Sequence, residues 1–182
     1  MKQWCSFIYI GLWIISGLVC SVQAKEVNTI LTSDQSHPLV NILETQYDAY
    51  RESQSKGDTE TYKNIRATKI VNAMLQHLKQ QNKLNEFTSV LQKSAKGGYN
   101  YSDFQFLSLN AVGNTARLAY SRPSKKTDAS GQPRIDFLLI MFHQEEVWKI
   151  GYIKFTNAPE VKEDGTITTL DDVTIDAKFR LP

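Results

Sequence analysis

The chain has 182 residues, of which 41% are hydrophobic and 22% charged, and its formal net charge at pH 7 is +2. This length is normal for a single domain with a sizeable buried core. Its 21 basic and 19 acidic residues nearly balance, and no long basic block occurs, so the composition gives no electrostatic support for nucleic-acid binding.

The first 24 residues have the organisation of a secretory signal peptide. Lys2 supplies the positive start, residues 7–20 are almost wholly apolar, and Val22-Gln23-Ala24 has the residue sizes that signal peptidase requires. Because the apolar stretch is shorter than the roughly 20 residues of a membrane span, we expect cleavage after Ala24 and export to the periplasm or the exterior, with no stable membrane span left. The alternative is an uncleaved membrane anchor formed by residues 4–24.

The exported chain contains no cysteine, because Cys5 and Cys20 both lie in the signal segment. It therefore has no disulfide and no thiol ligand, which fits a bacterial periplasm better than a small eukaryotic secreted module. The three histidines, His37, His77 and His143, have no metal-ligand spacing. We expect neither a metal nor another cofactor.

The first half of the exported chain predicts helices. Residues 25–37 are polar and aperiodic and predict a flexible leader. A helix is expected to begin at Pro38 and to end at Gly57, with Asp58 capping the next one. Gly97-Gly98 is expected to stop the last helix in the left-handed cap geometry. The three later helices are predicted near residues 59–66, 67–81 and 83–95.

The apolar spacing changes from helical to alternating near residue 100, which predicts strands. Gly113-Asn114 is suited to a tight hairpin turn, and the last segment alternates again as an edge strand over 173–181. Helices followed by an antiparallel meander predict a single α+β domain over residues 38–155, with helices packed on a curved sheet. Residues 156–182 form a C-terminal extension. The four hairpin strands are predicted at 103–112, 115–122, 134–143 and 147–155.

The strand over 134–143 is apolar on both faces, so both faces need cover. The helices are expected to cover one face. A homodimer is our hypothesis for the other, and the alternative is that residues 156–182 fold back over it. The candidate dimer face consists of Leu138, Ile140, Phe142, Ile153 and Phe155.

Two short steps, Lys56-Gly57-Asp58 and Val147-Trp148-Lys149-Ile150-Gly151-Tyr152, together with the order of elements, resemble the nuclear-transport-factor-2-like superfamily, which includes SnoaL-like and cystatin-like cones. The resemblance covers about residues 38–155. It implies a cone-shaped fold with a pocket at its open end and frequent dimers. Its relatives include isomerases, dehydratases, cyclases, immunity proteins and periplasmic parts of secretion machines, so it implies no single activity. The usual early strand between the helices is not visible in this sequence.

The candidate pocket residues are aromatic and polar side chains expected near the open end of the cone: Tyr47, Tyr50, Tyr120, Trp148 and His143. Asp136 has the opposite strand parity from His143, and we expect it to form a rim pair with Arg134. Lys125-Lys126 with Arg122 and Arg134 form a small basic cluster around one loop, which we interpret as a solvated rim. Tyr99 and Tyr101 are candidates for a pocket mouth or a protein contact, although simple packing is the favoured interpretation.

No convergent catalytic set and no nucleotide-binding motif occurs in the sequence. We therefore expect an exported, non-enzymatic binding or protein-interaction module of the bacterial envelope, whose partner is a small apolar ligand or another envelope protein. One alternative is a small pocket enzyme of the isomerase, dehydratase or hydrolase type that uses a buried acid and a tyrosine. A second alternative is a periplasmic component of a secretion apparatus.

Overall fold

The computed structural model describes residues 29–127 and 131–174. The predicted signal peptide, its cleavage site and residues 175–181 of the predicted last strand lie outside this part of the chain, whereas residues 173 and 174, where that strand was expected to begin, are helical. None of the helices in the described part is long and apolar enough to cross a membrane.

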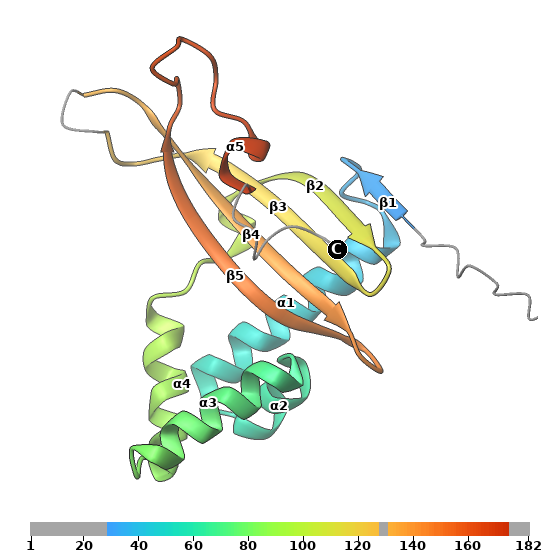
Figure 1. The fold of residues 1–182 in the computed structure, drawn as a ribbon, viewed down its shortest axis with the longest axis vertical. Helices are drawn as coiled ribbons and strands as arrows, with labels where there is room; N and C mark the ends of the chain where they lie inside the picture. The colour runs from blue at the N-terminus through green and yellow to red at the C-terminus, as the bar shows by residue number, and fades with distance from the viewer. Residues whose placement is uncertain (1–28, 128–130, 175–182) are drawn as a thin grey trace, which may run out of the picture.

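Five strands form one antiparallel sheet in which neighbours in the chain are neighbours in space (Figure 1). Four of them confirm the two hairpins expected from the alternating spacing. Gly113 has a φ of 59° in the tight turn of the first hairpin, a conformation that favours glycine. The strands are β1 (Thr29–Thr32), β2 (Gln105–Val112), β3 (Thr115–Pro123), β4 (Arg134–Gln144) and β5 (Trp148–Pro159).

Strand β1 corrects the prediction of a flexible leader over residues 25–37. It pairs antiparallel with the end of β2, with Thr29 opposite Val112 and Thr32 opposite Leu109. A strand this short at the edge of a sheet has too few buried side chains to produce a periodic pattern in the sequence. Strand β1 precedes the first helix, and none of the described residues between α1 and α4 forms a strand.

Four α-helices lie between β1 and β2, in the part of the chain where the spacing of apolar residues predicts helices. Pro38 stands in the first turn of α1, and Gly57 ends that helix with a φ of 71°. Asp58 caps α2, because its carboxylate accepts a hydrogen bond from the Thr61 amide at 3.0 Å. The helices are α1 (Pro38–Lys56), α2 (Thr59–Ile65), α3 (Thr68–Gln80), α4 (Phe87–Lys96) and, near the C-terminus, α5 (Leu170–Thr174).

The Gly97-Gly98 step ends α4, but not by the predicted left-handed cap. Gly97 has a φ of −97°, which any residue adopts. At Gly98 an added Cβ would come within 1.6 Å of the Arg51 guanidinium, so the end of that side chain would have to shift. That guanidinium donates to the Ala95 carbonyl at 2.8 Å, so it ties α1 to the end of α4.

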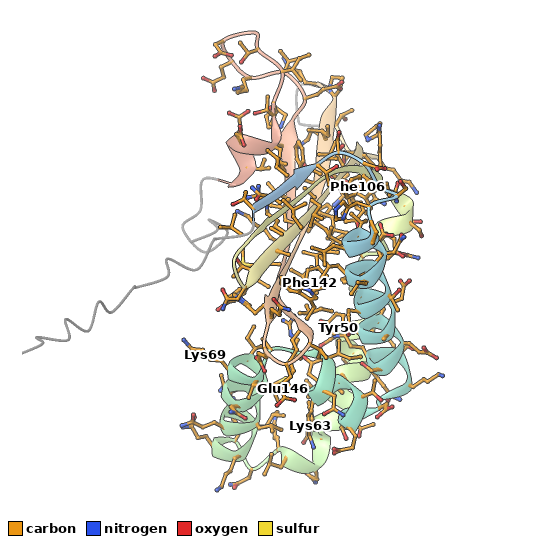
Figure 2. All side chains as sticks on the ribbon, turned by 90° about the vertical axis from the view of Figure 1, so that its right-hand side faces the viewer. Tyr50, Lys63, Lys69, Phe106, Phe142 and Glu146 are labelled. Atoms are coloured by element: carbon orange, nitrogen blue, oxygen red, sulfur yellow. The ribbon has the colours of Figure 1, made fainter. Side chains whose placement is uncertain are left out.

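Helix α1 lies along one face of the sheet, with α2, α3 and α4 grouped beyond its C-terminal end, and α5 lies on the other face (Figures 1 and 2). Leu138, Ile140 and Phe142 of β4 are fully buried on the helix-covered face, in one cluster with Val40 and Leu43 of α1. The structure thus places these three candidate dimer residues in the core of the single chain, where a second copy has no access to them. We call this helix-covered side the inner face of the sheet. The apolar side chains of α1 are buried against it.

The two remaining candidate dimer residues also face the helical side. Ile153 packs against the main core cluster. Phe155 stacks on Tyr99, with ring centroids 4.1 Å apart and an interplanar angle of 8°. Both side chains belong to β5 and are half-buried.

The opposite face of β4 carries a second apolar cluster formed by Ala119, Leu139 and Met141. Leu107 and Leu170 pack against it, and Leu170 belongs to α5. The prediction that β4 is covered on both faces is confirmed. The C-terminal extension supplies part of the outer cover, which was the alternative to a second subunit.

Candidate functional site

Two of the candidate pocket residues, Tyr47 and Tyr50 of α1, do line a cavity. It has a volume of about 210 Å³ and lies between α1, the end of α4 and β5. The Tyr47 hydroxyl donates to the Tyr99 carbonyl at 2.7 Å, and burial raises the pKa of Tyr47 to about 12. At neutral pH this tyrosine is a hydrogen-bond donor and not a base.

Tyr120, the third candidate tyrosine, is a core residue. Its side chain is fully buried, and its hydroxyl donates to the Glu44 carboxylate at 2.9 Å. Burial, reinforced by the nearby Glu44 charge, raises the pKa of Tyr120 far above neutrality. Through Tyr101, whose ring centroid lies 5.5 Å from that of Tyr120 and 5.8 Å from that of Tyr47, it joins a continuous row of aromatic rings.

His143 and Trp148 lie away from these tyrosines, beside the turn between β4 and β5. His143 pairs with Lys149 across the two strands. Its imidazole lies against Gly151, where an added Cβ would come within 2.6 Å of the ring. Trp148 packs against the edge of the main core. The five candidates therefore do not form one site.

A second cavity, of about 310 Å³, lies at the other end of these strands. Antiparallel pairing brings the end of β3, the start of β4 and the end of β5 together there. Arg122 stands opposite Asp136, and Asp136 stands opposite Asn157, so three polar residues form one row across the sheet. Phe155 and Tyr99 form an aromatic wall that this cavity shares with the smaller one. Its polar lining consists of Arg122, Ser124, Lys125, Lys126, Asp136 and Asn157.

Asp136 is the acid of this cavity, and both of its carboxylate oxygens accept hydrogen bonds. Arg122 Nε donates to Oδ2 at 3.1 Å, and Asn157 Nδ2 donates to Oδ1 at 2.6 Å. Arg134 does not pair with Asp136 as we predicted. It donates to the Asn157 side chain, and to the Asn157 carbonyl at 2.9 Å. Asp136 is also buried, with 3% of its surface exposed, so it is not on the rim.

The Arg122 guanidinium is held from two directions. Asp136 binds its Nε, and the Phe104 ring lies beneath it with 4.2 Å between Cζ and the ring centroid, a cation–π distance. Phe104 in turn meets Tyr99 edge to face, with centroids 6.4 Å apart. The guanidinium and the aromatic wall are therefore parts of one packed unit.

The lining of this cavity carries more positive than negative charge. Arg122, Lys125 and Lys126 are cationic, and Asp136 is anionic and already paired with Arg122. Lys125 and Lys126 are exposed, and neither forms an ion pair with any residue in the described ranges. Three of the four residues that we interpreted as a solvated basic rim, Arg122, Lys125 and Lys126, thus line a cavity, whereas Arg134 does not.

Sequence reasoning did not connect Tyr99, Phe155 and the basic loop. Tyr99 was expected at a pocket mouth, and Phe155 on a dimer face. No spacing rule links a residue after a helix to one on the last strand, since only the path of the chain after α4 brings Tyr99 onto Phe155. Over residues 29–127 and 131–174, no group of His, Cys, Asp or Glu is placed to hold a metal ion.

Comparison with known proteins adds no assignment to this geometry. No protein-family model, curated protein or solved structure matches the chain.

Proposed function

We propose that the chain is an exported binding module of the nuclear-transport-factor-2-like cone type, and that its ligand site is the 310 Å³ cavity at the end of β3, β4 and β5. One observation carries the proposal. This cavity combines an aromatic wall with a row of polar side chains held in place by each other, as in small-molecule sites. Its volume lies near the lower end of the range for such sites, about 300–1,000 Å³.

The hydrogen bonds and the burial of Asp136, the acid of this cavity, favour a binding function over a catalytic one. A general base must lie within hydrogen-bond reach of the substrate proton, and Asp136 is poorly placed for this because 3% of its surface is exposed. Both oxygens of Asp136 already accept hydrogen bonds, one of them from a guanidinium. His143 lies at the far end of β4, so it is not available as a partner at this cavity.

The proposal is tested by native mass spectrometry of the chain isolated from the compartment to which it is exported. We expect a non-covalent small-molecule adduct on the wild-type protein. Ser124→Trp fills the cavity and removes the adduct, whereas Asn72→Trp on the exposed surface of α3 keeps it. An adduct that survives Ser124→Trp, or natively isolated protein without any adduct, contradicts the proposed site.

Export itself is tested on the same sample. Cleavage of the predicted signal peptide gives a mature chain that begins at Lys25, and N-terminal sequencing reads this directly. A chain that retains residues 4–24 and sediments with membranes would instead establish the anchor.

A further inference from the structure

The positive charge and the aromatic side chains of the 310 Å³ cavity indicate which class of ligand it binds. This inference rests on the proposed function. We infer that the ligand is an anion that carries a flat aromatic or conjugated group. Its negative group meets the cations of the β3–β4 loop, and its flat group lies against the Tyr99–Phe155 wall.

The cations favour a negative ligand group because, within the described residues, one carboxylate faces three of them. Asp136 already pairs with Arg122, and its second oxygen is taken by Asn157. Lys125 and Lys126 follow directly on Ser124 and line the same cavity, and they make no ion pair within the described ranges. A positive ligand would meet three cations and one engaged carboxylate, which disfavours it by Coulomb repulsion.

Arg122 is the strongest anion-binding group of the set. Its Nε is occupied by Asp136, and no hydrogen bond from its Nη1 or Nη2 is found to any residue of the described chain. The guanidinium is fixed by Asp136 and Phe104, so little conformational freedom is lost when the remaining N–H groups bind an oxyanion. Arginine suits planar oxyanions because it can donate two parallel hydrogen bonds.

The aromatic wall favours a flat group over a bulky aliphatic one. Tyr99 and Phe155 are stacked and half-buried, and Phe104 supports Tyr99 from its edge. Aromatic rings stack on such surfaces in offset or edge-to-face geometry, with a gain beyond simple apolar burial. The ring and the cations border the same cavity, so one small molecule can meet both.

The test measures binding of a matched series to the mature chain by isothermal titration calorimetry: 2-naphthoate, 2-naphthylmethanol, 2-naphthylmethylammonium and acetate. We expect 2-naphthoate to bind about tenfold more tightly than the neutral alcohol, and the ammonium and acetate to bind more weakly still. Raising the salt concentration should weaken binding of the naphthoate and leave binding of the neutral alcohol unchanged.

Charge reversal locates the anion. The double variant Lys125→Glu/Lys126→Glu should lower naphthoate affinity by about tenfold and leave the alcohol unchanged. The control, Lys93→Glu/Lys96→Glu, reverses two exposed lysines of α4 that do not line this cavity and should change neither.

The outcomes separate the inference from the proposed function. Equal binding of naphthoate, alcohol and ammonium overturns the charge class but leaves a small-molecule site. Acetate binding as tightly as naphthoate overturns the aromatic part. If no naphthalene compound binds, the ligand class is wrong, while the native adduct and its loss in Ser124→Trp decide the proposed function independently.

Discussion

At the scale of single residues, Asp136 is a buried carboxylate at the centre of a hydrogen-bond network. It is buried and accepts from Arg122 and Asn157, and Asn157 in turn receives hydrogen bonds from Arg134 and donates to Ser124 at 3.0 Å. A buried carboxylate with such partners costs free energy to desolvate, and its removal leaves the donors without an acceptor. The network therefore shapes the cavity and also binds three strand ends together.

Replacing this carboxylate tests the network. We expect Asp136→Ala to lower the free energy of unfolding by about 2–4 kcal/mol, because Arg122 and Asn157 lose their shared acceptor. Urea denaturation followed by circular dichroism measures the change. Glu163→Ala, at an exposed position of the C-terminal extension, is the control and should change stability by less than about 0.5 kcal/mol. A loss for Asp136→Ala as small as that of the control would contradict the described network.

At the scale of elements, the start of α3 depends on a residue from a distant hairpin. Ala67 occupies the N-cap position and has no side-chain acceptor. Glu145, in the turn between β4 and β5, takes this role: it accepts from the Thr68 amide at 2.9 Å and from Lys149 Nζ at 2.9 Å. A negative charge at a helix N-terminus also interacts favourably with the helix dipole. The carboxylate thus fastens α3 to the sheet.

This contact predicts a pH dependence. Hydrogen bonds from the Thr68 hydroxyl and from Lys149 lower the pKa of Glu145 to about 2, against 4.5 for an ordinary glutamate. Because the folded-state pKa is the lower one, the stabilisation is fully present above about pH 4.5 and is lost as the pH falls towards 2.

We expect Glu145→Gln to cost about 1 kcal/mol at pH 7, as for the loss of a helix cap, and to cost little near pH 2, where about half of the wild-type carboxylate is protonated. Urea denaturation at pH 7, 4 and 2 measures both values. Glu146→Gln changes the adjacent, exposed glutamate and serves as the control. A pH-independent difference between wild type and Glu145→Gln would show that charge plays no part in this cap.

At the scale of the whole molecule, the sheet lies between two unequal covers (Figure 2). Helix α1, joined by α2, lies against the inner face, whereas the outer cluster of Ala119, Leu139 and Met141 is covered in the described chain by Leu107 and by Leu170 of α5. Lys154 secures α5 by donating to the Val173 carbonyl at 3.2 Å. Detachment of the short helix α5 would therefore be enough to expose the outer apolar cluster to solvent.

Leu170→Asp tests this cover. A charge cannot replace the leucine on an apolar surface, so we expect α5 to leave the sheet and expose the outer cluster. The variant should lose about 1–2 kcal/mol of stability and associate more strongly than wild type, as measured by size-exclusion chromatography with light scattering. Ile167→Asp is a matched control, because Ile167 is already 69% exposed. Identical masses for all three proteins across a concentration series would contradict the covering role.

Most helices and strands could be predicted from the amino-acid sequence, because the residues that define them lie close together in the chain. Helix α1 was predicted with its boundaries because Pro38, Gly57 and the spacing of its apolar residues all act within a few residues of each other. The two hairpins and the two-sided apolar strand β4 were predicted for the same reason, since alternation records directly which faces are buried. The α+β class followed from the order of these elements.

The packing partner of each apolar face could not be predicted from the sequence and is seen in the three-dimensional structure alone. Strand β1 was missed because four residues at an edge carry no pattern, and the inner and outer faces of β4 are equally apolar in the sequence. The cavity depends on the strand register that aligns Arg122, Asp136 and Asn157, and on the chain after α4 that places Tyr99 on Phe155. Periodicity specifies a buried face but not its partner, because the partner is chosen by packing between segments that are distant in the chain.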